Sequence, residues 1–274
     1  MLIGQLTDTH VVDPSGDTEL YVDNNARLVE AIAAINAETV ALDAVLATGD
    51  LVNDVSPGEY VALTAMLAEL DAPLLPLPGN HDDRSLFVEA FPHMAWADGG
   101  HLSWVEFVRG VRIIGLDTQR PGSEGGQFDE ERADWLRAQL EHDHDGVTVL
   151  AMHHPPFATG IEWMDRPGFP GVEQFGEIVG GGGVDRIVCG HVHRPVTGAI
   201  GGVVAQVAMS TVHHVALDLA EVSQPSVILD PVGYQIHRVA DGAVLTHARY
   251  IATGETSFVP DWADPVEPVS SNPN

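Results

Sequence analysis

Residues 73–83 read PLLPLPGNHDD, an apolar segment followed directly by a glycine, an amide, an imidazole and two acids. The apolar half predicts a short buried strand. Its tip carries Asn80, His81, Asp82 and Asp83. Ligand sites of open α/β sheets assemble at the carboxyl ends of strands, so this tip is a candidate functional site.

The same arrangement follows other apolar segments of the chain. Each polar cluster begins where a predicted strand ends, and the further clusters are Asp8-Thr9-His10, Gly49-Asp50, His153-His154-Pro155 and Gly190-His191-Val192-His193. Carboxylates, an amide and imidazoles are the donor set of a two-metal site, not of a structural zinc held by thiolates.

The spacing inside the clusters supports convergence of the donors. Residues two apart on an extended strand point to the same side, so Asp8 and His10 are expected to face one place. The two histidines of GHVH have the same spacing. A glycine precedes Asp50, Asn80 and His191, and we expect it to permit a tight turn out of each strand.

Helices and strands alternate over the first two thirds of the sequence. Apolar spacing and helix-start residues predict helices over 22–38, 57–70, 129–141 and 173–179. Between them lie short apolar strands, which indicates an α/β fold. Beyond residue 195 the pattern changes to hairpins, with turns at Gly201-Gly202 and Asp241-Gly242.

Composition excludes several classes of function. The 274 residues carry a formal charge of −28, which opposes binding to nucleic acids and anionic membrane surfaces. Lysine is absent from the sequence, and this excludes a Schiff-base enzyme and a Walker A loop. Cys189 is the single cysteine, so there is no intramolecular disulfide. The start MLIGQLTDTH predicts neither a signal peptide nor a membrane span, and we expect a cytoplasmic protein.

Taken in order, D-x-H, GD, GNHD, HHPP and GHVH resemble the motifs of the calcineurin-like metallophosphoesterase family. Their spacing is similar to that of its class III cyclic nucleotide phosphodiesterase branch, which also contains a bacterial glycerophosphodiesterase. The segment TVHHVALDL at 211–219 resembles a motif of that branch. The resemblance implies a four-layer αββα sandwich with a catalytic domain over 1–195, a hairpin-rich cap or dimerisation region over 196–255 and an irregular tail over 256–274.

The resemblance also implies two divalent metal ions, of Fe, Mn, Zn or Co. Carried over to this sequence, the ligands of the first ion are Asp8, His10, Asp50 and His193. The ligands of the second ion are Asp50, Asn80, His153 and His191. Asp50 would bridge the two ions, because each of its oxygens can serve one of them.

The implied reaction is hydrolysis of a small phosphodiester by a water that the metals activate, and a 3′,5′-cyclic nucleotide is the expected substrate. Asp50, Asn80 and His81 are the expected catalytic residues. His81 would contact the phosphate or protonate the leaving group, an effect worth about 10²–10⁴-fold. His213 is expected to contact the substrate with Asn80 and His81, and His154 to orient His153. A homo-oligomer is expected, with no nucleic acid or membrane partner.

Alternatives within the same resemblance remain open. One is a glycerophosphodiester hydrolase. Another is a phosphomonoesterase, which needs cations around a dianionic phosphate, although only Arg84 and Arg194 lie near the motifs. A nuclease is opposed by the acidic composition. A scaffold without catalysis should have lost ligands, whereas this sequence keeps each expected donor.

Overall fold

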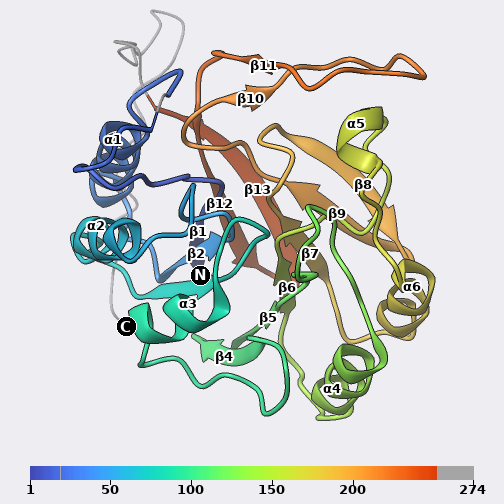
Figure 1. The fold of residues 1–274 in the computed structure, drawn as a ribbon. Helices are drawn as coiled ribbons and strands as arrows, with labels where there is room; N and C mark the ends of the chain where they lie inside the picture. The colour runs from blue at the N-terminus through green and yellow to red at the C-terminus, as the bar shows by residue number, and fades with distance from the viewer. Residues whose placement is uncertain (19, 252–274) are drawn as a thin grey trace, which may run out of the picture.

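A computed structural model describes residues 1–18 and 20–251 and shows two β-sheets packed face to face (Figure 1). The first sheet has the strand order β13-β12-β1-β2-β3, in which β1, β2 and β3 are parallel. Its strands are β1 (Leu2–Leu6), β2 (Ala44–Thr48), β3 (Leu74–Leu77), β12 (Gly233–Ala240) and β13 (Ala243–Tyr250).

The second sheet has the order β4-β5-β6-β7-β9-β8, with a parallel centre and antiparallel edge strands. Its strands are β4 (Trp104–Val108), β5 (Val111–Leu116), β6 (Thr148–Met152), β7 (Arg186–Cys189), β8 (Val196–Ile200) and β9 (Val203–Val207). A separate two-stranded ribbon joins β10 (His214–Val215) to β11 (Val227–Ile228).

Helices cover the outer face of each sheet (Figure 1). On the first sheet lie α1 (Asn24–Asn36), α2 (Pro57–Leu67) and α3 (Arg84–Ala90), and on the second lie α4 (Glu130–Leu140) and α6 (Val172–Gly180), while the short α5 (Glu162–Asp165) lies near the ribbon. The four predicted helices are confirmed: α1, α2 and α4 lie within their predicted ranges, and α6 extends one residue beyond its range at each end.

Side-chain caps explain where the helices begin. Ser56 forms a capping box with Glu59 at the start of α2, which places Pro57 in the first turn. Asp129 accepts the backbone N–H of Arg132 at the start of α4. Asp83 caps α3 in the same way, accepting the backbone N–H groups of Ser85 and Leu86.

The core lies between the sheets and beneath both helix layers. Every residue of β2, β5 and β6 is buried, as expected for strands covered on both faces. One apolar cluster unites Ile3 and Leu46 of the first sheet with Ile113 and Val149 of the second. The two packed sheets with outer helices confirm the four-layer sandwich.

The hairpins beyond residue 195 do not form a separate layer. Strands β8 and β9 extend the second sheet, and β12 and β13 extend the first, because their backbone N–H and C=O groups complete the open edges. Of the described part of the predicted cap region, residues 196–251, only residues 208–232, which contain β10 and β11 and are called the ribbon segment below, contribute no strand to the two large sheets. The expected tail over 256–274 lies outside the described residues. Within the described part of the chain, no helix is both long and apolar enough to cross a membrane.

Candidate metal centre

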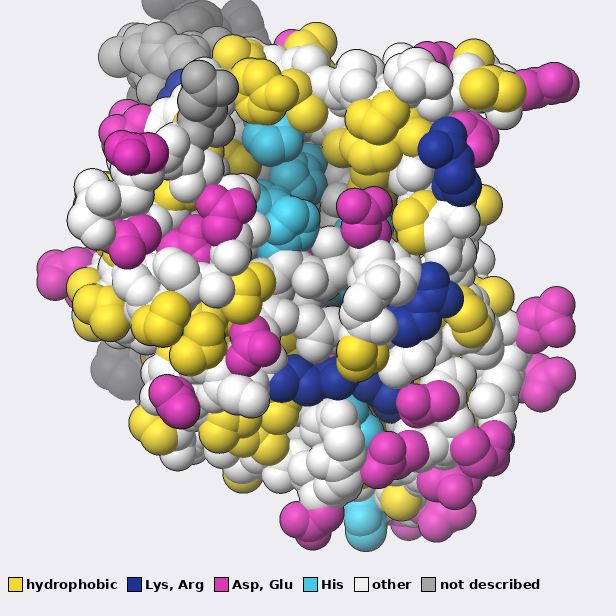
Figure 2. All heavy atoms as spheres, in the orientation of Figure 1, with side chains coloured by type: hydrophobic (Ala, Val, Ile, Leu, Met, Phe, Trp, Pro, Cys, Tyr) yellow, Lys and Arg dark blue, Asp and Glu magenta, His cyan; other side chains and the backbone are white. Residues whose placement is uncertain are grey.

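The tips of β1, β2, β3, β6 and β7 meet at one edge of the sandwich, because these parallel strands all end there. In the space-filling view, histidine side chains gather in a hollow of this edge (Figure 2). The structure brings the seven predicted ligands together there, in overlapping groups around two carboxylates.

Asp8, His10 and His193 form the first group. Nε2 of His10 lies 3.1 Å from Nε2 of His193, and the latter atom lies 3.3 Å from an oxygen of Asp8. An oxygen of Asp50 lies 4.0 Å from Nε2 of His10. All four side chains are buried. Two imidazole nitrogens and two carboxylates therefore face the same small volume.

The second group shares Asp50. Nε2 of His153 lies 3.3 Å from Asp50 Oδ2 and 3.2 Å from Asn80 Oδ1. The ring of His191 has its centroid 5.2 Å from that of His153. The position of Asp50 between the two groups fits the predicted bridging role, which stays a prediction.

The backbone at the ligands is unusual. Eight non-glycine residues in the described chain have a positive φ, and five of them are predicted ligands, namely Asp8, His10, Asp50, His191 and His193. A left-handed residue costs roughly 1–2 kcal/mol, so the fold maintains this strain at the site. Asp8 and His10 meet in the first group through this backbone, and not through the pleat of an extended strand as the spacing suggested. His191 and His193 lie in different groups, so the expectation that both histidines of GHVH face one place is wrong.

The glycines of the motifs provide room for close approach. A Cβ at Gly79 would lie 2.3 Å from Asp50 Oδ1, and one at Gly190 would lie 2.0 Å from Thr7 Oγ1. Gly49 has a φ of +90° and packs against the ring of His153. At Gly49 the backbone has the conformation that glycine was expected to permit. At Gly79 and Gly190 glycine is required because a side chain would not fit.

Hydrogen bonds to the protein fix the orientation of the ligands. Nδ1–H of His153 donates to the carbonyl of Thr48 at 2.8 Å, which directs Nε2 toward Asp50. The hydroxyl of Thr7 donates to Asp8 Oδ2 at 2.7 Å, and the hydroxyl of Ser210 donates to the Asp8 carbonyl at 2.7 Å. These contacts hold the donors in place from behind.

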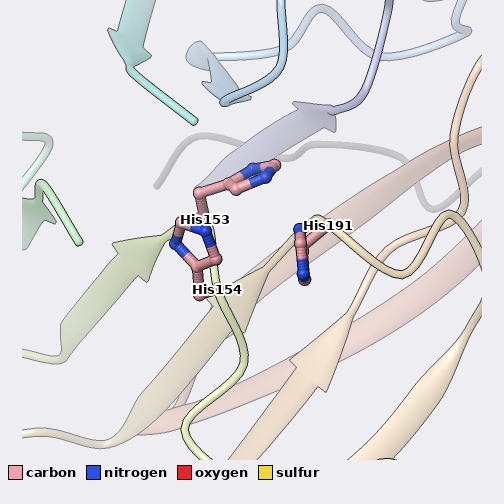
Figure 3. A group of neighbouring side chains, drawn as sticks. All are labelled: His153, His154 and His191. Carbon is pink, nitrogen blue, oxygen red and sulfur yellow. The ribbon is translucent and has the colours of Figure 1, made fainter. Parts of the chain in front are cut away.

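His154 lies beside this group but has no free nitrogen. Figure 3 shows His153 and His154 leaving the end of β6, with His191 facing them. Nε2–H of His154 donates to the Glu124 carbonyl, so Nδ1 accepts the Thr118 hydroxyl at 2.8 Å. Burial and the neighbouring His191 hold the pKa of His154 well below its usual value. The ring is therefore fixed and neutral, but its partners are Thr118 and Glu124, and its predicted role in orienting His153 stays a prediction.

His81 lies at the mouth of the site. Its backbone N–H donates to Asp50 Oδ1 at 2.8 Å, and its Nδ1–H donates to the Asn53 carbonyl at 2.9 Å. Burial lowers the pKa of His81, but the charge of Asp50 and the bond to Asn53 together raise it above its usual value. The remaining Nε2 can therefore carry a proton.

His213 is brought to the same place from the loop before β10. Its ring centroid lies 4.6 Å from that of His193 and 6.3 Å from that of His10. Burial and His193 lower its pKa to about 4. His213 is thus a neutral ring at the rim of the first group, and its predicted contact with substrate stays a prediction.

The sequence reasoning missed the segment that follows β5. Thr118 holds His154, and the Gln119 side chain donates to the carbonyls of Gly79 and Asp82 on either side of Asn80 and His81. The signal was present, because the polar residues of GLDTQ also follow an apolar strand.

Charges at the centre suit a cation. Burial raises the pKa of Asp8, but the charge of His193 and the hydrogen bond between the two side chains outweigh burial and lower the pKa to about 2. Burial and His193 lower the pKa of His10 to about 3. Burial lowers the pKa of His153, but the charge of Asp50 raises it to about 9, so a bound ion would have to displace the proton of this imidazole. The carboxylate, amide and imidazole donors themselves fit the two-ion site.

The arginines near the motifs are engaged elsewhere. Arg84 pairs with the buried Asp117 at 2.8 Å, and Arg194 donates to the Val215 carbonyl at 2.7 Å. Arg120, in the segment after β5, donates to Ser123 and to the Pro167 carbonyl. Each of these three arginines therefore has at least one partner inside the protein, and Arg120 also lines a hollow together with Asn80 and His81.

Comparisons with known proteins agree with this site. Residues 1–195 match the family model described as Calcineurin-like phosphoesterase. A probable glycerophosphodiester phosphodiesterase of Arcobacter nitrofigilis is 33% identical over 94% of this chain and 96% of its own length. A cAMP/cGMP dual specificity phosphodiesterase of Mycobacterium tuberculosis is 31% identical over 78% of this chain and 69% of its own.

Solved structures share the fold. A purple acid phosphatase from yellow lupin superposes with a TM-score of 0.63 at 13% identity, covering 93% of this chain and 52% of that one. The fold and the five strand-end motifs define a metallophosphoesterase. The chain belongs to the calcineurin-like phosphoesterase family, in the branch with these bacterial phosphodiesterases.

Proposed function

We propose that this protein is a binuclear metal-dependent phosphodiesterase that hydrolyses 3′,5′-cyclic nucleotides. The observation that carries the proposal is the convergence of the seven predicted ligands, with the Asp50 carboxylate between His10 and His153. When bound, two divalent ions would supply an activated water and positive charge for the phosphate. Fe, Mn, Zn and Co all suit these imidazole and oxygen donors.

The protein's own residues would orient the substrate and supply a proton. Asn80 and His81 come from one loop, so a phosphate beside Asn80 also meets the imidazole. The Asn53 carbonyl fixes the ring of His81 through Nδ1, which leaves Nε2–H as the donor to the departing oxygen. His213 closes the opposite side near His193.

A diester substrate accords with the cations near the site. A phosphate monoester brings two negative charges, and a diester brings one. Arg84, Arg120 and Arg194 each bind partners inside the protein, so the centre would depend on the metals for positive charge. This supports a phosphodiesterase over a phosphomonoesterase.

Glycerophosphodiester hydrolysis is the second candidate, because a relative with that name aligns over nearly its whole length. The test compares kcat/KM of manganese-loaded enzyme on cyclic AMP and on glycerophosphoethanolamine. A preference for cyclic AMP of about tenfold or more supports the proposal, and the reverse preference refutes it. Metal analysis of the purified protein, with Asp50→Ala as the control, gives the identity and number of the ions.

We further propose that the protein forms a homo-oligomer through its ribbon segment. Six large apolar side chains are exposed on it, namely Leu217, Leu219, Val222, Val227, Ile228 and Leu229. Apolar side chains at this density are typical of a surface that associates. Light scattering at micromolar concentration should give at least a dimer, and Leu219→Glu with Leu229→Glu should give a monomer. A monomeric wild-type protein would refute this proposal.

A further inference from the structure

A second feature of the same edge is a pocket beneath α5. Its floor consists of His154, His191 and Val192, and its walls include Phe157, Met164 and Phe169, from the segment that carries α5. The volume of the cavity is about 180 Å³. It is therefore a defined hollow large enough for a small ring, and it opens beside the metal centre.

The pocket is continuous with the proposed catalytic site through one side chain. His191 is a predicted ligand of the second ion and also lines the pocket. Figure 3 shows its ring facing His153 and His154. A substrate whose phosphate lies at the ions would therefore have this pocket beside it, on the side of His154 and His191.

The two aromatic walls are packed directly over glycines. A Cβ at Gly126 would lie 2.5 Å from the Phe169 ring, and one at Gly198 would lie 2.7 Å from the Phe157 ring. Glycine at these positions allows both rings to sit close to the backbone. The lining is consequently flat and apolar, which suits a planar ring better than a flexible polar chain.

Apart from His191, a predicted metal ligand, the polar side chains of the lining already have partners. His154 uses both nitrogens within the protein. The Asp165 carboxylate accepts the backbone N–H groups of Thr159 and Gly160, and also the hydroxyl of Thr159. The pocket thus has little capacity to read the hydrogen-bond pattern on the edge of a ring.

We propose that this pocket binds the nucleobase of the cyclic nucleotide by stacking on Phe157 and Phe169, which makes these two residues determinants of specificity. The inference rests on the proposed function. Because the edge of the base is not read, cyclic AMP and cyclic GMP should be hydrolysed with kcat/KM values within about tenfold of each other. Glycerophosphodiesters have no ring and gain nothing from the pocket.

The alternative place for the base is the opposite rim. There Tyr21 lies with its ring centroid 6.4 Å from that of His213 and is 76% exposed. An exposed ring excludes little water, whereas the pocket encloses its occupant on several sides. The pocket is therefore favoured, and Tyr21→Ala distinguishes the two places.

The experiment measures kcat/KM on cyclic AMP, cyclic GMP and glycerophosphoethanolamine for Phe169→Leu and Phe157→Leu. Leucine keeps the apolar volume and removes the flat face. Base stacking on an aromatic ring predicts a loss of about tenfold on both cyclic nucleotides, mainly in KM, with glycerophosphoethanolamine unchanged within about twofold. Phe107→Leu is the matched control, since Phe107 is 61% exposed on β4.

Binding of adenosine gives a readout without catalysis. Titration calorimetry should show that adenosine binds wild type and binds the Phe169→Leu variant about tenfold more weakly. The inference is overturned if kcat/KM of both leucine variants on the cyclic nucleotides matches that of wild type, or if only Tyr21→Ala lowers kcat/KM on cyclic AMP. It is also overturned if the leucine variants lose kcat/KM equally on all three diesters. If the wild type hydrolyses no diester, the proposed function fails, and the adenosine titration still decides whether the pocket takes a base.

Discussion

The two sheets contribute different chemistry to one site. The tips of the first sheet carry both carboxylates, the amide of Asn80 and a single predicted imidazole ligand, His10. The tips of β6 and β7 in the second sheet contribute only imidazoles as predicted ligands. The centre is therefore a junction at which an oxygen-rich sheet meets a nitrogen-rich one.

This difference shows how the site is organised. The carboxylates of the first sheet also bind backbone, because Asp8 accepts the N–H of His191 at 3.0 Å and Asp50 accepts the N–H of His81. The imidazoles of His153 and His154 are oriented by a carbonyl or a hydroxyl behind them. Carboxylates thus join the loops, and imidazoles complete the donor set.

The largest effect is expected from Asp50→Ala. It removes the oxygen that faces both groups and the acceptor of the His81 N–H. Loss of an outer partner of a metal ligand alone costs about 10–100-fold, so loss of a shared ligand should lower kcat/KM by at least about 10³-fold. Steady-state kinetics at saturating manganese is the measurement.

The control is Asp54→Ala, an exposed acid on the loop after β2. It should retain activity within about twofold. If Asp50→Ala lowers kcat/KM by less than tenfold, the carboxylates of the first sheet do not organise the centre.

Removal of metal should produce the next largest effect. At a free ion concentration of 100 times the Kd, binding stabilises the native state by about 2.7 kcal/mol. This corresponds to about 5–10 °C in Tm for a chain of this size. Calorimetry before and after chelation measures the difference. The Asp50→Ala variant should show a much smaller drop, and an equal drop would show that the ions bind without the shared carboxylate.

Much of this comparison could be predicted from the sequence. Strands, helices and the seven ligands have local signals, because apolar runs end in polar clusters and acids cap helices at Asp83 and Asp129. The predicted ligands come together as the motif order implied. Local chemistry is sufficient where each residue carries its own signal.

Long-range pairing had no such signal. The turns at Gly201-Gly202 and Asp241-Gly242 predicted two hairpins correctly, but hairpin residues do not say which sheet edge will accept them. The left-handed backbone of His191 and His193 is set by tertiary contacts, and its residues look extended in sequence. Gln119 escaped notice because its partners are the carbonyls of a distant loop.

The sheets also meet away from the site, through a buried polar pair. Nε2–H of His237 in β12 donates to the Gln5 side chain of β1, and the amide of Gln5 donates to the carbonyl of Cys189 in β7. Burial and Arg186 lower the pKa of His237 from 6.5 to about 3. This imidazole is neutral in the folded protein and binds a proton only after unfolding.

The sign of the pH effect follows from that shift. Between the unfolded pKa and the folded pKa the unfolded chain binds more protons, so stability decreases as pH falls. From pH 8 to pH 5 the loss caused by His237 is about 2 kcal/mol. Urea titrations at each pH measure the free energy of unfolding. Between pH 8 and pH 5 this free energy should fall by about 2 kcal/mol less in His237→Gln than in wild type. Parallel pH profiles would show that the imidazole is exposed to solvent.

The smallest effect, and the sharpest test of the comparison, is expected at Gln119. This amide follows β5 of the second sheet, yet it donates to Gly79 and Asp82 around the Asn80 loop of the first. Gln119→Met keeps the length of the side chain and removes both hydrogen bonds. The loop that carries Asn80 and His81 should loosen, with a fall in kcat of about tenfold and weaker binding of the second ion while the first is retained.

Metal titration beside kinetics separates this positioning role from general destabilisation. Gln174→Met is the matched control and should behave as wild type, because this half-buried amide of α6 donates to Glu130, far from the centre in the fold. If Gln119→Met lowers Tm but leaves kcat and the second ion unchanged, the residue only joins the sheets. If the second ion is lost selectively, the carboxylates are not the only residues that organise the centre. In that case the Gln119 amide, from the nitrogen-rich second sheet, positions the oxygen ligand Asn80 of the first sheet.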